Sequence, residues 1–104
     1  VFNKFGTDTV TDFSKTDGDK IDLRSLLSGS GINILSTTSL GQFLSLTQSS
    51  TDAVLKVDVD GIANFTTPEL TINLQGAWSA LQPSGGQSAN ENLLTLFNDR
   101  VFLA

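Results

Sequence analysis

Two neighbouring segments of alternating apolar and polar residues constrain the fold of this chain more than any other feature. In the first, residues 53–60, one face of an extended strand collects Ala53, Leu55, Val57 and Val59. In the second, Leu70, Ile72 and Leu74 alternate with Thr71, Asn73 and Gln75. Because a period of two residues fits a strand and not a helix, we expect a β-hairpin whose connection spans residues 61–68.

Shorter patterns predict the remaining elements. Further strands are expected at residues 9–13, 20–23, 32–35, 43–47 and 101–103. Brief helices are expected near residues 25–27, after an N-cap at Ser39, and after an N-cap at Asn90 or Asn92. Trp78 and Leu81 are expected to cover one end of the core, which is a commoner role for a lone tryptophan than stacking on a sugar. The predicted fold class is mainly β: a single domain resembling a β-sandwich or β-roll, with two or three short helices.

Composition narrows the chemistry that this chain can support. The 104 residues carry a formal net charge of −5, so long-range repulsion opposes binding to nucleic acids and anionic membranes. There is no Cys and no His, which removes disulfides, thiolate metal sites and the commonest general base. Carboxylate and carbonyl oxygens remain, and these ligands suit calcium or magnesium. No apolar run has the length of a membrane span, so we expect no membrane insertion.

Aspartates concentrate near the start of the chain. Five of them fall within 15 residues: Asp8, Asp12, Asp17, Asp19 and Asp22. The last three surround a turn and can converge on one cation, which predicts calcium as the cofactor. Asp8 and Asp12 would lie about 13 Å apart on an extended strand, too far for one calcium shell. The alternative is that these carboxylates cap backbone N–H groups in polar loops.

A second acidic pair, Asp58 and Asp60, ends the strand expected at residues 53–60. With Gly61 it resembles part of an EF-hand loop, but Lys56 and Thr67 would hold the first and twelfth positions, where Asp and Glu are needed. The favoured interpretation is a solubilising strand face that discourages edge pairing, with calcium ligation as the alternative.

Residues suited to catalysis are scarce. Glu69 and Glu91 fall in expected loops without a partner for acid–base work. Serine and threonine nucleophiles lack a histidine base. We therefore expect a domain that is not an enzyme.

Motifs along nearly the whole chain resemble one bacterial family. Residues 6–10 (GTDTV) fit the second half of the nonapeptide G-G-x-G-x-D-x-U-x of calcium-binding β-rolls, with Asn3 and Lys4 at the first two glycine positions. The chain resembles the C-terminal targeting domain of RTX proteins exported by type I secretion in five successive stretches: GTDTVTDF, GDKIDLRSLLSG, FLSLTQSSTDAVLKVDVDG, LTINLQG and NLLTLFNDRVFLA. The first two also resemble the region after the β-roll of serralysin-type metalloproteases, and the VDVDG and leucine-rich stretches resemble large repetitive adhesins.

The resemblance implies one non-enzymatic domain over residues 1–104. It divides into the end of a calcium β-roll (1–13), a β core (14–81), a flexible loop (82–89) and a helix–strand secretion signal (90–104). The apolar residues of that signal are Leu93, Leu94, Leu96, Phe97, Val101, Phe102 and Leu103. The implied partners are a type I ABC transporter complex and upstream RTX repeats of the same chain, whose residues would complete the calcium sites.

The implied location is extracellular or at the cell surface, and the expected state is a monomer within a longer secreted protein. Two alternatives stay open. One is a structural or adhesive surface module, as in an S-layer or a biofilm adhesin. The other is the accessory tail of a secreted protease or lipase. The position of this segment in its parent protein would discriminate among the three.

Overall fold

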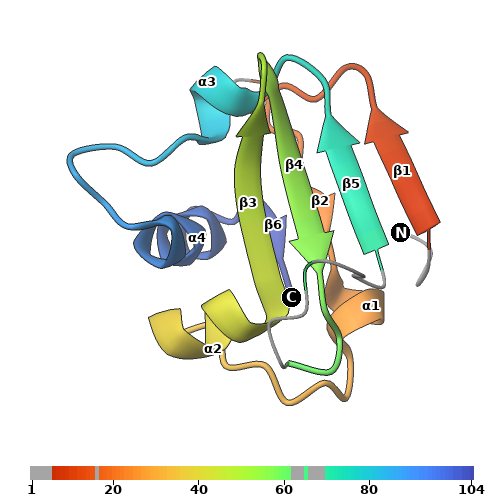
Figure 1. Cartoon of the computed structure of the whole chain (residues 1–104), viewed down its shortest axis with the longest axis vertical. Coiled ribbons are helices and arrows are strands. Elements are labelled where there is room, and N and C mark those ends of the chain that lie inside the picture. Colours follow the sequence, from red (N-terminus) through yellow and green to blue (C-terminus); the bar gives the residue numbers. More distant parts are fainter. Residues whose placement is uncertain (1–5, 16, 62–64, 66–69) are drawn as a thin grey trace.

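The computed structural model describes residues 6–15, 17–61, 65 and 70–104, of which strands make up about 29% and helices about 27%. The elements follow one another as β1 (Gly6–Val10), β2 (Ile21–Asp22), α1 (Arg24–Leu27), α2 (Thr37–Phe43), β3 (Leu44–Ser49), β4 (Asp52–Val57), β5 (Leu70–Leu74), α3 (Trp78–Leu81), α4 (Ala89–Asn98) and β6 (Phe102–Leu103). Figure 1 shows them gathered around one sheet.

A four-stranded mixed sheet in the order β1-β5-β4-β3 organises the domain. β3, β4 and β5 are antiparallel neighbours, with Leu55 of β4 opposite Ile72 of β5. The hairpin predicted from the alternating segments is therefore confirmed, although β4 ends at Val57. β1 lies on the other side of β5 as a parallel strand, with Asp8 opposite Ile72. It covers residues 6–10, three positions earlier than the strand expected at 9–13.

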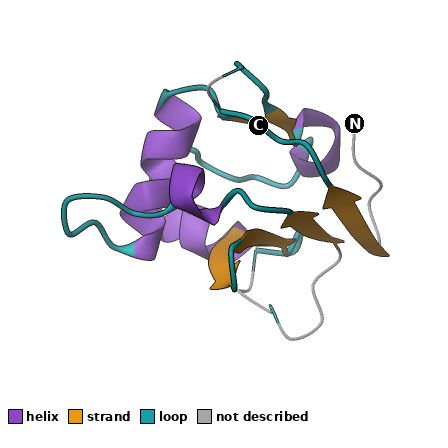
Figure 2. Cartoon of the chain, turned by 90° about the horizontal axis from the view of Figure 1, so that it is seen from above, coloured by secondary structure: helices purple, strands orange, loops and turns teal. Residues whose placement is uncertain are grey.

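One face of the sheet forms the floor of the core. Its buried side chains are Leu44, Leu46, Ala53, Leu55, Val57, Leu70, Ile72 and Leu74. In Figure 1 the strands β2 and β6 lie behind this sheet and α4 lies beside its β3 edge, and Figure 2 shows most of the helices gathered at one end of the sheet. Each buried leucine or isoleucine contributes about 1.5–3 kcal/mol relative to an exposed one, so this interface supplies much of the stability.

The opposite face of the sheet carries mainly polar residues. One row across all four strands consists of Thr7, Thr71, Lys56 and Ser45. A β-sandwich would place a second full sheet over the apolar face, whereas here helices share that place with the two-stranded pair of β2 and β6. The described residues thus form a single domain with a mixed sheet and similar shares of strand and helix, so the mainly β prediction holds only in part.

The C-terminal segment closes the core. β6 runs parallel to β2, with Phe102 opposite Ile21. The backbone N–H of Ile21 donates to the Val101 carbonyl at 2.8 Å, and that of Leu23 donates to the Leu103 carbonyl at 2.7 Å. Both strands were expected from sequence, but their pairing joins residues some 80 positions apart and carries no local signal.

The helix starts differ from those expected. Ser36, not Ser39, caps α2: its hydroxyl accepts a hydrogen bond from the Ser39 N–H. Ser88 caps α4 through a capping box in which the Ser88 hydroxyl accepts from the Glu91 N–H and the Glu91 carboxylate accepts from the Ser88 N–H. The N-cap predicted at Asn90 or Asn92 was therefore wrong.

The strand expected at residues 32–35 was also wrong. Ile32 and Ile34 alternate with exposed neighbours, but this segment is a loop between α1 and α2. Asn33 explains the bend: its side-chain oxygen accepts a hydrogen bond from the Leu35 N–H, and its carbonyl accepts one from the Ser36 N–H. The other helix and loop expectations, α1 near residues 25–27 and the loop at 82–89, are confirmed within one residue of their bounds.

Candidate functional site

The seven aspartates predicted as calcium ligands are spread over several parts of the fold. Among the described residues, no group of three or more His, Cys, Asp or Glu side chains is close enough to hold a metal ion. The resemblance implies that residues upstream of Val1 would complete the sites. Calcium ligation by these residues therefore stays a prediction, and the geometry of each aspartate shows what it does here.

Asp8 occupies an unusual place for a carboxylate. It lies opposite Ile72 in the register of β1 with β5, so it is on the apolar side of the sheet and is partly buried. An inward-pointing charge on an edge strand discourages pairing with other chains. Asp12 follows the end of β1 and is exposed.

Asp17 and Asp19 belong to a compact loop held by Ser14. The Ser14 N–H donates to Asp19 Oδ2 at 2.9 Å, and the Asp19 N–H donates to the Ser14 carbonyl at 3.0 Å. The Ser14 hydroxyl accepts from the Asp17 N–H at 3.2 Å. For Asp19 the loop-capping alternative is thus what the structure shows, and one of its two carboxylate oxygens is engaged.

Asp22 is held by a two-point ion pair. Its Oδ1 accepts from Arg24 Nε at 3.0 Å and its Oδ2 from Arg24 Nη2 at 2.8 Å, and Oδ1 also accepts from the Arg24 N–H. These hydrogen bonds, the side-chain ones foremost, lower the pKa of Asp22 to about 2. With both oxygens directed at a guanidinium, Asp22 is the least available of the seven for a cation.

Asp58 stabilises a turn that follows β4. It is 1% exposed, which overturns the prediction that it lies on a solubilising strand face. Its N–H donates to the Phe43 carbonyl at 2.8 Å, and its Oδ1 accepts from the Asp60 N–H at 3.2 Å. The turn closes where the Gly61 N–H donates to the Asp58 carbonyl. The V-D-V-D-G motif is therefore at least a structural turn, in which Asp60 is exposed.

Gly61 shows why this turn needs its glycine. Its φ is +73°, and a Cβ placed on it would lie 2.5 Å from Cζ of the buried Phe43 ring. From sequence, this glycine was expected to start a hairpin connection and to resemble part of an EF-hand loop, and its contact with Phe43 was not foreseen. The other residue that sequence reasoning missed is Asp52, whose Oδ1 accepts from the Gly76 N–H at 2.8 Å and joins the start of β4 to the end of β5.

The predicted secretion-signal residues are mostly part of the core. Exposed fractions of 6% or less are found for Leu93, Leu96, Phe97, Val101 and Phe102, while Leu94 and Leu103 are partly buried. The rings of Phe97 and Phe102 meet edge to face at 5.7 Å. Asn92, also buried, donates from Nδ2 to the Leu81 carbonyl at 2.8 Å and ties α4 to α3. In the folded domain this segment is therefore a packing element.

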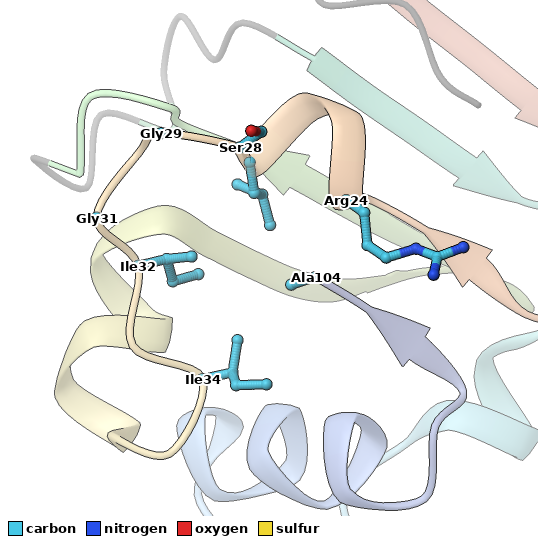
Figure 3. A pocket seen from close by; sticks show the side chains of 8 residues that line it. Arg24, Ser28, Gly29, Gly31, Ile32, Ile34 and Ala104 are labelled. Carbon is cyan, nitrogen blue, oxygen red and sulfur yellow. The ribbon is translucent and has the colours of Figure 1, made fainter.

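Two adjoining hollows lie beside the C-terminal strand. One, of about 480 Å³, is lined by Leu27, Ile32, Ile34 and Ala104 among others. Figure 3 shows Ile32 and Ile34 pointing toward Ala104 from the loop between α1 and α2, while the Arg24 side chain extends away from them. The other, of about 410 Å³, shares Arg24, Ile34 and Ala104 and adds Arg100. The surface of the first suits packing of an apolar group, the second is more polar, and no predicted ligand residue lines either.

We predict that Gly61→Ala destabilises the domain more than Gly29→Ala does. Both glycines have φ near +75°, so both alanines pay a similar backbone cost of about 1–2 kcal/mol. A Cβ at Gly29 meets open space, whereas at Gly61 it meets the Phe43 ring, which adds about 1–3 kcal/mol of overpacking. Urea unfolding of both variants measures the difference, and equal losses would contradict the close packing of the turn on Phe43.

We predict that Asp22→Asn flattens the acid dependence of stability. Because the folded pKa of about 2 lies below the ordinary 3.8, the ion pair stabilises the fold fully above about pH 4 and this contribution is lost as pH falls through about 2. The pair is exposed, so the effect is small and weakened by salt. The measurement is the urea concentration at the midpoint of unfolding, taken at several pH values between 4 and 2, with Asp17→Asn as the control. If this midpoint changes with pH in the same way for Asp22→Asn and the parent chain, the prediction is refuted.

No helix among the described residues combines the length and apolar character required to cross a membrane. Compared with known proteins, the chain matches no family model, no curated protein and no solved structure.

Proposed function

We propose that this chain is a non-enzymatic C-terminal domain of a longer secreted protein, and that residues 90–104 carry an uncleaved type I secretion signal. The observation that carries the proposal is the state of this segment in the fold. It is one helix–strand unit whose apolar side chains are buried against the rest of the domain. A transporter can reach those side chains only while the domain is unfolded, which is the state in which a chain threads a channel.

Two further features support export in an unfolded state. The chain has no cysteine, so no disulfide can form before or during passage. The strand β6 that completes the core pairs with β2, near the other end of the chain. The fold therefore stays incomplete until both ends are present, and an export complex that holds the C-terminal segment also keeps the core open.

We further propose that the domain caps a calcium β-roll upstream of it. β1 is an edge strand of the sheet and runs parallel to its neighbour β5, which is the strand direction that a parallel roll uses. Asp8 lies partly buried on this strand, and Asp12 follows it. In this proposal the upstream turns would supply the remaining calcium ligands, and the location would be extracellular or at the cell surface.

Removing residues 90–104 from a passenger fused to this chain should abolish its export by a co-expressed type I transporter. The physical reason is that the deletion removes the apolar residues that the transporter would bind. The measurement is the amount of passenger in the medium relative to that in the cells. Undiminished export of the deleted fusion would defeat the proposal.

A matched control separates recognition from folding. Leu55→Ala empties part of the core outside the proposed signal and should destabilise the fold by about 2–5 kcal/mol. Its export should equal that of the parent fusion, because the signal is intact. If Leu55→Ala also blocks export, the loss in the deletion reflects the folded state and not a signal.

Calcium at millimolar concentration should raise the melting temperature of the chain extended by its upstream repeats. An ion that binds only the folded state stabilises it by about 2.7 kcal/mol at a hundredfold excess over its dissociation constant. Replacing Asp8 and Asp12 together by Asn should reduce this shift, whereas Asp99→Asn, exposed after α4, should leave it unchanged. An unchanged melting temperature on calcium titration would remove the calcium part of the proposal and leave export standing.

A further inference from the structure

A hollow of about 290 Å³ lies between the β3–β4 turn and α3, and it shares no lining residue with the two hollows beside the C-terminal strand. It is lined by Gln48, Ser50, Thr51, Gly76, Trp78 and Ser79. In Figure 1 the tip of the β3–β4 hairpin and α3 lie side by side at the top of the molecule. Its volume is just below the usual range for ligand pockets, about 300–1,000 Å³, which limits it to a small ligand.

Hydrogen bonds fix the residues that line this hollow, and several hydroxyl groups of the lining take no part in them. The backbone N–H of Trp78 donates to the Thr51 carbonyl at 3.1 Å, and Gln48 Nε2 donates to the Ser50 carbonyl at 2.9 Å. The Asp52 carboxylate accepts from the Gly76 N–H. Within the described part of the chain, the hydroxyls of Ser50, Thr51 and Ser79 make no hydrogen bond. Three hydroxyl groups thus surround a partly exposed tryptophan on a prearranged frame.

Ser50 adopts a backbone conformation that is strained for any residue with a side chain. Ser49 pairs with Asp52, so Ser50 and Thr51 form a two-residue hairpin turn, and Ser50 has φ +57°. Glycine is the usual first residue in such turns, because a side chain is strained in the left-handed region. Strained residues concentrate at functional sites. A serine here contributes a hydroxyl to the rim that a glycine would lack.

The charge and chemistry of the lining define the class of ligand. None of the six lining residues is charged, and the nearby Asp52 carboxylate disfavours anions. An aromatic side chain beside hydroxyl and amide groups matches a sugar ring, which presents C–H groups on one side and hydroxyls at its edge. We propose that this hollow binds a neutral saccharide, with Trp78 as the stacking surface and Ser50, Ser79 and Gln48 as hydrogen-bonding partners. This saccharide site is proposed independently of the export role.

The composition of the chain gives a direct readout. Trp78 is the one tryptophan in the sequence and there is no tyrosine, so intrinsic fluorescence reports on this hollow. The probes are the methyl glycosides of glucose, galactose, mannose and N-acetylglucosamine, with glucuronate as the anionic comparison. We expect at least one neutral glycoside to change the Trp78 emission saturably, with a dissociation constant on the order of millimolar. The backbone amides of Thr51, Trp78 and Ser79 should shift in the NMR spectrum at the same concentrations.

Three variants locate the binding. Ser50→Gly relieves the strained φ, so it should raise the melting temperature while weakening binding up to about tenfold through the lost hydrogen bond. Ser79→Ala should weaken binding similarly without loss of fold. Ser28→Ala, an exposed serine beside the larger hollow, should bind as the parent chain does. The proposal is overturned if no neutral glycoside gives a saturable signal, if glucuronate alone binds, or if Ser50→Gly and Ser79→Ala both bind like Ser28→Ala.

Discussion

Burial of one face of the β3–β4–β5 sheet beneath the C-terminal helix and strand links the remaining features of this domain. Leu55 and Ile72 are fully buried on that face, and Leu93 and Phe102 belong to the same core. Each such side chain contributes about 1.5–3 kcal/mol, whereas a domain of this kind is stable by only about 5–15 kcal/mol in total. A few of these contacts therefore decide whether the chain is folded, and the segment proposed as an export signal supplies several of them.

The acidic residues illustrate how one residue type serves different local needs. Asp19 caps a loop, Asp22 holds an arginine, Asp52 joins two strands, and Asp58 shapes a buried turn. Each bond satisfies a backbone or guanidinium donor that would otherwise need water. Only Asp8 is placed against the apolar side of an edge strand, where either a cation or solvent has to meet its charge. This separates structural aspartates from the one whose position most favours the calcium proposal.

Sequence reasoning predicted the central hairpin because the alternation at residues 53–57 and 70–74 reports directly on a one-sided sheet. It misplaced the cap of α2 because Ser36 and Ser39 are equally good capping residues, and the choice is made by the fold. It missed Ser88 although the S-x-x-E spacing to Glu91 was present. The parallel pairings of β1 with β5 and β2 with β6, and the burial of Asp58, depend on residues distant in sequence and leave no local pattern. The hollow at Trp78 likewise forms only when the β3–β4 turn meets α3.

The pairing of β2 with β6 also bears on synthesis at the ribosome. Residues 21–22 are made before most of the domain, but their partner strand at residues 102–103 is made after every other described element. Until then the β2 edge and the apolar face of the sheet have no complete cover, so these residues have no closed core until the partner strand has been made. Co-translational folding of this domain is thereby delayed to its last residues, and holdase chaperones have that interval in which to bind it.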